Sequence, residues 1–277
     1  MRLFPSSVAS GFSRTWVILL ALLAGGCNVQ VGGDGLSIGV GSSARDEWTR
    51  TYTLPAGGEL DIVNVNGRIT ATPAEGRQVE VRVEREARGG SEEEAQALMK
   101  SVEMREEVTA NRVRIEARAD VSGFGRRGFS ATYTLRIPAG LVVSVKTENG
   151  GIRFDNVSGR ITATTTNGGI DGHGIVGSIN AEVVNGGVDI SMAEVTGDIN
   201  LTAVNGAIQI QIPADTGASL EATCVNGAIN VDDAFSLQAS ESSRRRVSGT
   251  INGGGSRIVT STVNGGVRIR QTQSGPG

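Results

Sequence analysis

Residues 149–166 read NGGIRFDNVSGRITATTT and residues 167–184 read NGGIDGHGIVGSINAEVV, so two neighbouring segments of 18 residues begin with the same tripeptide. The tripeptide Asn-Gly-Gly or Asn-Gly-Ala starts at Asn149, Asn167, Asn185, Asn205, Asn226 and Asn264. Each of these asparagines has an aliphatic residue six positions before it and another three positions after it. The same frame occurs once earlier, around Asn66. One structural unit is therefore repeated along the chain, which is typical of stacked architectures.

The aliphatic residues of the repeat follow one another in steps of nine, at positions 152, 161, 170, 179 and 188. This step fits neither a helix nor a tight hairpin, but it fits two short strands in each coil of about 18 residues. Within the strands, apolar and polar residues alternate, as in residues 208–212, which read IQIQI. Alternate side chains of a strand face the same side. We therefore predict an all-β chain that folds as a parallel β-solenoid.

An antiparallel meander is the alternative, because Asn-Gly is also a strong signal for a hairpin turn. A meander predicts Asn-Gly at every pair of strands and no fixed register between successive pairs. Here Asn-Gly alternates with a second kind of turn, such as Val157-Ser158-Gly159, which favours the solenoid. In stacked coils, the six asparagines can form a ladder in which each side-chain amide binds the next coil. Asn also tolerates the left-handed backbone that a tight corner needs.

The repeat also predicts how the chain is divided. Residues 47–142 contain the first coil and a β-rich insert with one short helix, opened by the capping box SEEE at residues 91–94. We expect this segment to cover the first end of the solenoid. Residues 143–270 hold the remaining repeats, and residues 232–250 interrupt them as a polar loop that leaves the stack. Residues 271–277 form a tail.

The far end of the predicted solenoid has no such cover. The last repeat places Val267 and Ile269 in the final coil, with only a short tail after it. We expect these residues to have a neighbouring layer on one side only. Arg268 and Arg270 would then be edge charges that discourage a second molecule from pairing there.

The N-terminus resembles the leader of a bacterial lipoprotein. Arg2 and Arg14 precede a short apolar run, which is typical of a secretory signal and well below the length of about 20 residues that spans a bilayer. Residues 22–27 read LLAGGC, which resembles a lipobox. We expect residues 1–26 to be a signal peptide, Cys27 to be lipidated and residues 27–46 to form a Gly-rich tether. An ordinary cleaved signal with a nearby Cys is the alternative.

The composition bounds the possible partners and the core. The chain has 26 Lys and Arg, 29 Asp and Glu, and a net charge of −3. The leader contains two of the arginines, so the remainder is more acidic and has no electrostatic footprint for nucleic acid. With 40 Gly and only 4% aromatic residues, the chain favours a thin core with many tight turns. The membrane is the partner that the lipid anchor implies.

The residues that could carry chemistry are few. His173 is the only histidine and lies in a Gly-rich corner, so we expect it on the surface. Cys224 falls in an inward position of its coil, so a small buried core residue is favoured over a nucleophile. The arginines at 244–246 favour a solvated loop over a site for anionic lipid or glycan. Acids recur near the corners without calcium-binding or catalytic spacing, at Asp155, Asp171, Asp189, Asp198 and Asp232. We expect no metal, no cofactor and no catalytic residue.

The Asn-Gly-Gly-Ile frame behind a lipoprotein-type leader resembles the bacterial putative adhesin family, a family of solenoid domains of unknown function. The resemblance covers about residues 48–270 and implies a fold without implying catalytic or binding residues. We therefore expect a non-catalytic lipoprotein, exported and lipid-anchored in the cell envelope, at the outer membrane or cell surface if the cell is Gram-negative. Its polar surface would bind a protein or glycan.

Two other functions remain open at this point. One is a carbohydrate-active enzyme on a β-helix, which requires two carboxylates about 5–10 Å apart in a groove. The other is a sensor or regulatory lipoprotein for envelope stress. The sequence identifies neither the ligand nor the oligomeric state.

Overall fold

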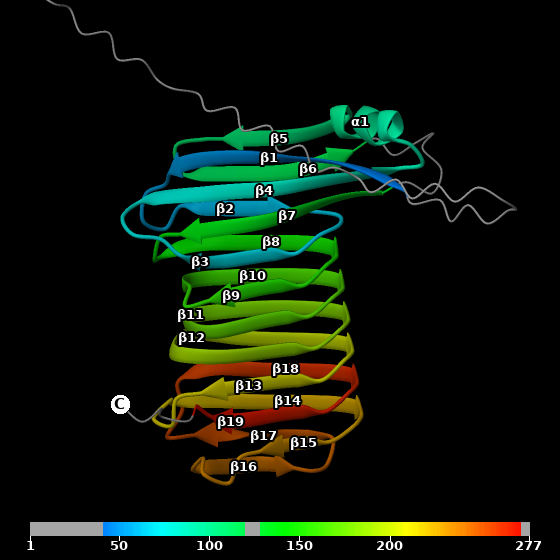
Figure 1. The fold of residues 1–277 in the computed structure, drawn as a ribbon. Coiled ribbons are helices and arrows are strands. Elements are labelled where there is room, and N and C mark those ends of the chain that lie inside the picture. The colour runs from blue at the N-terminus through cyan, green and yellow to red at the C-terminus, as the bar shows by residue number, and fades with distance from the viewer. Residues whose placement is uncertain (1–40, 120–127, 273–277) are drawn as a thin grey trace, which may run out of the picture. The chain divides into compact units, whose positions relative to one another are not determined.

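Residues 41–119 and 128–272 are described by a computed structural model (Figure 1). The elements are β1 (Ser42–Thr53), β2 (Glu59–Val63), β3 (Ile69–Pro73), β4 (Gln78–Gly89), α1 (Glu92–Lys100), β5 (Val102–Val108), β6 (Arg112–Ala119), β7 (Gly128–Ile137), β8 (Leu141–Asn149), β9 (Ile152–Asp155), β10 (Ser158–Asn167), β11 (Ile170–Asn185), β12 (Val188–Asn205), β13 (Ile208–Ile212), β14 (Ala218–Asn226), β15 (Ile229–Val231), β16 (Leu237–Ser242), β17 (Arg246–Ile251), β18 (Ser256–Asn264) and β19 (Val267–Gln271). All the strands join one 19-stranded sheet with parallel and antiparallel pairs. The prediction of an all-β chain is confirmed, with one helix in the described part.

The sheet curls because β11 and β12 are long enough to contribute to two sides. Residues 170–173 of β11 pair with β9, and residues 176–185 pair with β10. One side of the curled sheet, which we call the long side, consists of neighbouring strands in the order β8, β10, the second halves of β11 and β12, β18 and β14. The short side is the row β9, the first halves of β11 and β12, β13, β19 and β15. All pairs within these two rows are parallel, unlike those of an antiparallel meander.

The repeated aliphatic residues form the core between the two sides. On the long side, the register aligns Val143, Ile161, Ile179, Ile199, Ile258 and Leu220 in successive layers. On the short side, it aligns Ile152, Ile170, Val188, Ile208, Val267 and Ile229. All except Ile229, which is 9% exposed in the last layer, are at most 2% exposed. Each buried aliphatic side chain contributes roughly 1.5–3 kcal/mol, so the layers stabilise one another.

The tight corners depend on glycine and not on the asparagine that precedes it. Gly168 has a φ of +153°, and a Cβ at this position would lie only 2.2 Å from the carbonyl oxygen of Gly150 in the next layer. Among the described non-glycine residues, only Asn156 and Asn252 have a positive φ. The expectation that the repeated asparagines adopt left-handed backbone is therefore wrong. They end their strands in extended conformation and leave the unusual conformation to the next residue.

The last coil of the chain, residues 256–271, lies between two coils that precede it in the sequence. β18 pairs with β12 on one edge and with β14 on the other, and β19 lies in the same way between β13 and β15 (Figure 1). The prediction that Val267 and Ile269 form an open end is wrong, because their strand has a partner on both edges. Residues 213–217 connect β13 to β14 across this inserted layer. A repeated frame does not encode the order of its layers, and the sequence therefore gave no sign of the insertion.

Residues 232–250 form a hairpin, and the prediction of a polar loop that leaves the stack is wrong. β16 and β17 pair antiparallel, and β17 also pairs antiparallel with β14. Phe235 and Val247 are buried and extend the core at this end. β16 is exposed along nearly its whole length, so no apolar alternation marks it in the sequence. Backbone hydrogen bonds define this strand instead.

At the other end, antiparallel pairs and the helix accompany the parallel pairs that β2 and β3 make. β4 pairs with β1 and with β7, and β5 pairs with β6, in each case antiparallel. The helix α1 begins after Ser91, whose hydroxyl accepts a hydrogen bond from the N–H of Glu94 at 3.3 Å. The carboxylate of Glu94 accepts one from the N–H of Gly90 at 2.9 Å. The first bond satisfies an N–H that the helix terminus leaves unpaired, and the second ties the helix to the residue before its N-cap.

The predicted tether is shorter than expected where it can be observed. β1 begins at Ser42 and pairs with β4 from that residue onward, so residues 42–46 belong to the sheet. An edge strand exposed on one face carries little apolar alternation, which is why this start was missed. The predicted signal peptide, Cys27 and the tail after residue 272 lie outside the described residues.

Candidate functional site

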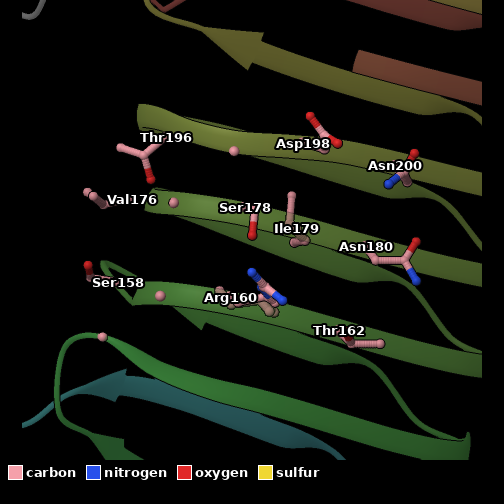
Figure 2. A pocket seen from close by; sticks show the side chains of 15 residues that line it. Ser158, Arg160, Thr162, Val176, Ser178, Ile179, Asn180, Thr196, Asp198 and Asn200 are labelled. Carbon is pink, nitrogen blue, oxygen red and sulfur yellow. The ribbon is translucent and has the colours of Figure 1, made fainter. Parts of the chain in front are cut away.

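A shallow trough of about 770 Å³ crosses the long side at β10, β11 and β12 (Figure 2). Its polar lining consists of Ser158, Arg160, Thr162, Ser178, Asn180, Thr196, Asp198 and Asn200. Hydroxyls and amides dominate this set, together with one guanidinium and one carboxylate. None of the lining residues is aromatic. The trough can therefore offer hydrogen bonds and charge, but no stacking surface.

Six of the polar side chains of the trough form two columns, because each of the six lies beside a buried isoleucine of its strand. Arg160 and Ser178 are register partners, and each directly precedes the isoleucine of its layer. Asp198 occupies the equivalent position in β12, after a register shift between β11 and β12. The second column, one position after the isoleucine, consists of Thr162, Asn180 and Asn200. Adjacent strands lie about 4.8 Å apart, so each column presents one polar group per layer.

The two charged groups of the trough have different surroundings. The guanidinium of Arg160 makes no hydrogen bond or ion pair with any other described residue. Asp198 accepts a hydrogen bond at 2.9 Å from the backbone N–H of Arg257, and the Arg257 guanidinium pairs with Glu221 at 3.1 Å. Arg160 is therefore the uncommitted cation of the trough. It can donate to a carboxylate, a phosphate or a hydroxyl of a partner.

The repeated asparagines lie together in one ladder at the end of the long side. Six side-chain hydrogen bonds of 2.7–3.0 Å join the asparagines of successive layers. In the order of the layers, these are Asn66, Asn149, Asn167, Asn185, Asn205, Asn264 and Asn226. In each bond, the amide nitrogen donates to the oxygen of the layer nearer the N-terminal segment. Aligned hydrogen bonds polarise one another in the same sense. Asn66 was not expected in the ladder, although the sequence frame around it matches the others.

Four valines accompany this ladder on its exposed side. Val184, Val204, Val263 and Val225 lie in consecutive layers, and each directly precedes a ladder asparagine. They are 41%, 37%, 40% and 55% exposed. Four partly exposed valines present far less than the roughly 800 Å² that each partner of a stable protein interface buries. This strip alone does not define a docking surface.

The other predicted candidates lie apart from the trough. His173 is exposed on the short side, where it is the register partner of Asp155. Cys224 is 5% exposed and packs in the core beside the other inward residues of β14, as predicted. Arg246, expected in a solvated loop, belongs to β17 and pairs with Glu221 at 3.3 Å and with Glu241 at 3.2 Å.

One pair of acids lies closer than the sequence suggested. Asp171 and Asp189 are register partners on neighbouring strands of the short side, so their backbones are about 4.8 Å apart. Neither lines the trough, in which Asp198 is the only carboxylate. Beside them, a hydrogen-bonded ion pair with Asp155 raises the pKa of Arg153. The pair was missed because its spacing of 18 residues becomes meaningful only once the register is known.

Residues 41–119 and 128–272 contain neither a cluster of metal-ligating side chains nor a membrane-spanning helix. No three His, Cys, Asp or Glu side chains of this part of the chain are placed to hold a metal ion. Its single helix, α1, has nine residues, and no helix there is long and apolar enough to cross a bilayer.

The comparison with protein families identifies most of the repeat region. Residues 139–270 match the model of the family Toastrack DUF4097, so this part of the chain is similar to domains of that family. This agrees with the resemblance to adhesin-like proteins of unknown function. No curated protein matches the chain.

Several solved structures are similar at low identity. A putative cell adhesion protein from Clostridium sporogenes is 11% identical, with 82% of this chain and 100% of that chain covered and a TM-score of 0.46. A putative adhesin from Bacteroides fragilis is 12% identical, with coverages of 82% and 97% and a TM-score of 0.28. A putative lipid binding protein from Parabacteroides distasonis is 10% identical, with coverages of 82% and 97% and a TM-score of 0.25. At such values, these similarities do not indicate a ligand.

Proposed function

We propose that this protein is a non-catalytic, adhesin-like lipoprotein of the cell envelope, and that its trough is the surface that binds a glycan or protein partner. The observation that carries the proposal is the uncommitted Arg160 in a trough lined by regularly spaced hydroxyls and amides. Such groups recognise a polar partner without chemically changing it. The spacing of about one group per 4.8 Å suits an extended partner that lies along the layers.

An enzymatic function receives less support. Glycoside hydrolysis uses two carboxyl groups about 5–10 Å apart on either side of the bond that is cleaved. The trough contains a single carboxylate, Asp198, which already accepts a hydrogen bond from the Arg257 N–H. Asp171 and Asp189 are neighbours, but they are not among the residues that line the trough. We therefore assign no catalytic residue.

The location of the protein is part of the proposal. Lipidation of Cys27, after removal of residues 1–26, would attach the chain to a membrane through acyl chains, each buried CH₂ of which contributes about 0.8 kcal/mol. Residues 28–41 would then serve as the tether. Export and anchoring place the described strands in the envelope, where an extracellular or cell-wall partner is accessible.

The finer features of the fold belong to the same proposal. We interpret the parallel rows as coils of one β-solenoid, in which the asparagine ladder stabilises one corner. The segment from β1 to β7, with α1, covers the first end, and the hairpin of β16 and β17 covers the other. Covering both ends protects exposed strand edges from association, so that partner binding occurs on the long side.

A glycan array that includes peptidoglycan fragments tests the binding surface. The full-length protein, purified in detergent, would be compared with Arg160→Ala and with Gln209→Ala, an outward residue of the short side that serves as the control. We expect binding of at least one glycan, a loss of tenfold or more in Arg160→Ala, and wild-type binding in the control. A bound glycan that does not distinguish wild type from Arg160→Ala would refute the trough as the site. Absence of any bound glycan would leave a protein as the partner, to be tested with the same two variants.

A further inference from the structure

The layer formed by residues 256–271 fills a slot between two completed coils. We define the slot as the space between β12–β13 on one side and β14–β15 on the other. The inserted coil bonds to both walls: the N–H of Gly206 donates to the carbonyl of Asn264 at 2.9 Å, and the N–H of Gly265 donates to that of Asn226 at 3.0 Å. Both walls precede the inserted coil in the chain. Their facing edges are therefore unpaired until this last coil arrives.

The slot recognises a repeat frame and does not depend on the chain that supplies it. Ile258 aligns with Ile199 on one wall and with Leu220 on the other, and Asn264 bonds to the ladder asparagines of both walls. None of these contacts requires the coil to belong to the same molecule. The same coil from a second molecule would make the same contacts.

The inserted coil contains a buried polar group without a partner. Thr260 is fully buried, and its hydroxyl has no hydrogen-bond partner. The neighbouring layers have Leu201 and Ala222 at this register position. A buried hydroxyl without a partner opposes burial of the coil, a cost that the two neighbouring layers do not have at this position.

The connection to this coil has the properties of a hinge. Residues 252–255 read NGGG and have positive φ values of 49°, 81°, 94° and 154°. A Cβ at Gly253 would meet no atom within 4 Å, so the segment has room to change direction. Three consecutive glycines can adopt another path at little steric cost.

We propose that the slot also accepts residues 256–271 of a second copy of this chain, so that two molecules exchange their last coils. The exchange remakes every contact of the coil and changes only the hinge, which is the low-cost route to a dimer that identical elements permit. The partner is thus another copy of this protein, and the exchanged coil would also supply the Arg257 N–H that bonds to Asp198 at the edge of the trough.

Engineered disulfides distinguish exchange from insertion within one molecule. The full-length chain with Cys27→Ser and Cys224→Ala has no cysteine left. In this background, Thr223→Cys and Ser261→Cys are placed on separate chains with different tags and co-expressed. Thr223 and Ser261 are register partners on adjacent strands, and a strand spacing of about 4.8 Å lies within the Cα separation of roughly 4.4–6.8 Å that a disulfide joins. We expect a disulfide-linked dimer that contains both tags.

A second pair provides the matched control. Thr164→Cys and Glu182→Cys, on separate chains, are outward register partners on β10 and β11, which lie in consecutive layers that do not exchange. The mixed dimer across the slot should exceed that of this pair severalfold. A single chain that carries both Thr223→Cys and Ser261→Cys should form an intramolecular disulfide in those molecules that keep their own last coil. The proposal would be overturned if the slot pair gave no more mixed dimer than the control pair while every molecule of the double variant formed its intramolecular disulfide. Failure of the double variant to form any disulfide would overturn the slot itself.

Discussion

Thr260→Val should stabilise the protein, although it changes a residue in the centre of the core. Thr260 is 0% exposed and its hydroxyl has no partner. Leaving a buried polar group unsatisfied costs about 1–3 kcal/mol, and valine replaces the hydroxyl with a methyl group of similar size. The added apolar group contributes about 0.8 kcal/mol more. We expect the free energy of unfolding to rise by about 2–4 kcal/mol.

Thr165→Val is the matched control in an equivalent environment. Thr165 is also 0% exposed, but its hydroxyl donates to the carbonyl oxygen of Gly150 at 2.9 Å. The same substitution therefore removes a hydrogen bond worth about 0.5–1.5 kcal/mol and leaves a carbonyl with one bond fewer. We expect this variant to be no more stable than wild type, and up to about 1 kcal/mol less stable.

Urea unfolding of both full-length variants, followed by circular dichroism, measures this difference. The midpoint should move to higher urea for Thr260→Val and should not do so for Thr165→Val, with similar slopes for all three proteins. If Thr260→Val proves no more stable than wild type, the hydroxyl has a partner and the coil of residues 256–271 is packed differently. A gain of equal size in both variants would mean that the hydrogen bond to Gly150 does not contribute.

Four further substitutions test the anchor, the alternation and the ladder. Cys27→Ser should release the protein from membranes and abolish lipid labelling in a fractionation experiment, and a variant that remained membrane-bound would refute lipidation. Ile179→Asp buries an unpaired carboxylate at a cost of several kcal/mol and should abolish cooperative unfolding. The control Asn180→Asp, one residue further along the strand, should unfold like wild type. Equal effects of the two substitutions would contradict the assigned inward and outward faces. Asn185→Ala removes two ladder bonds and should lower the free energy of unfolding by about 1–3 kcal/mol in urea titration, and an unchanged midpoint would show that the ladder is not stabilising.

Much of the local structure could be predicted from the sequence. The frame around each asparagine identifies which residues face inward, because the alternation of strands and the repeat of the coil reinforce each other. The burial of Ile161, Ile179 and Ile199 follows from that pattern alone. The helix α1 follows from its capping box at residues 91–94, which is a local signal.

The order of the layers could not be predicted, since every coil carries the same frame. Ile258 fits equally well beside Ile199 or Leu220, so only the three-dimensional arrangement shows that it lies between them. The hairpin of β16 and β17 was missed for a different reason: hydrogen bonding forms an exposed edge strand without apolar alternation. The trough was also invisible, because it depends on register shifts between β11 and β12 that place Asp198 in line with Ser178.

Adhesion by cells that carry the full-length protein tests the central claim most directly. Wild type would be compared with Arg160→Glu in the trough and with Arg153→Glu on the short side, after surface amount and folding have been matched. We predict that adhesion to the ligand-bearing surface is lost with Arg160→Glu and retained with Arg153→Glu. Equal adhesion by all three proteins would contradict the assignment of the trough on the long side as the binding surface.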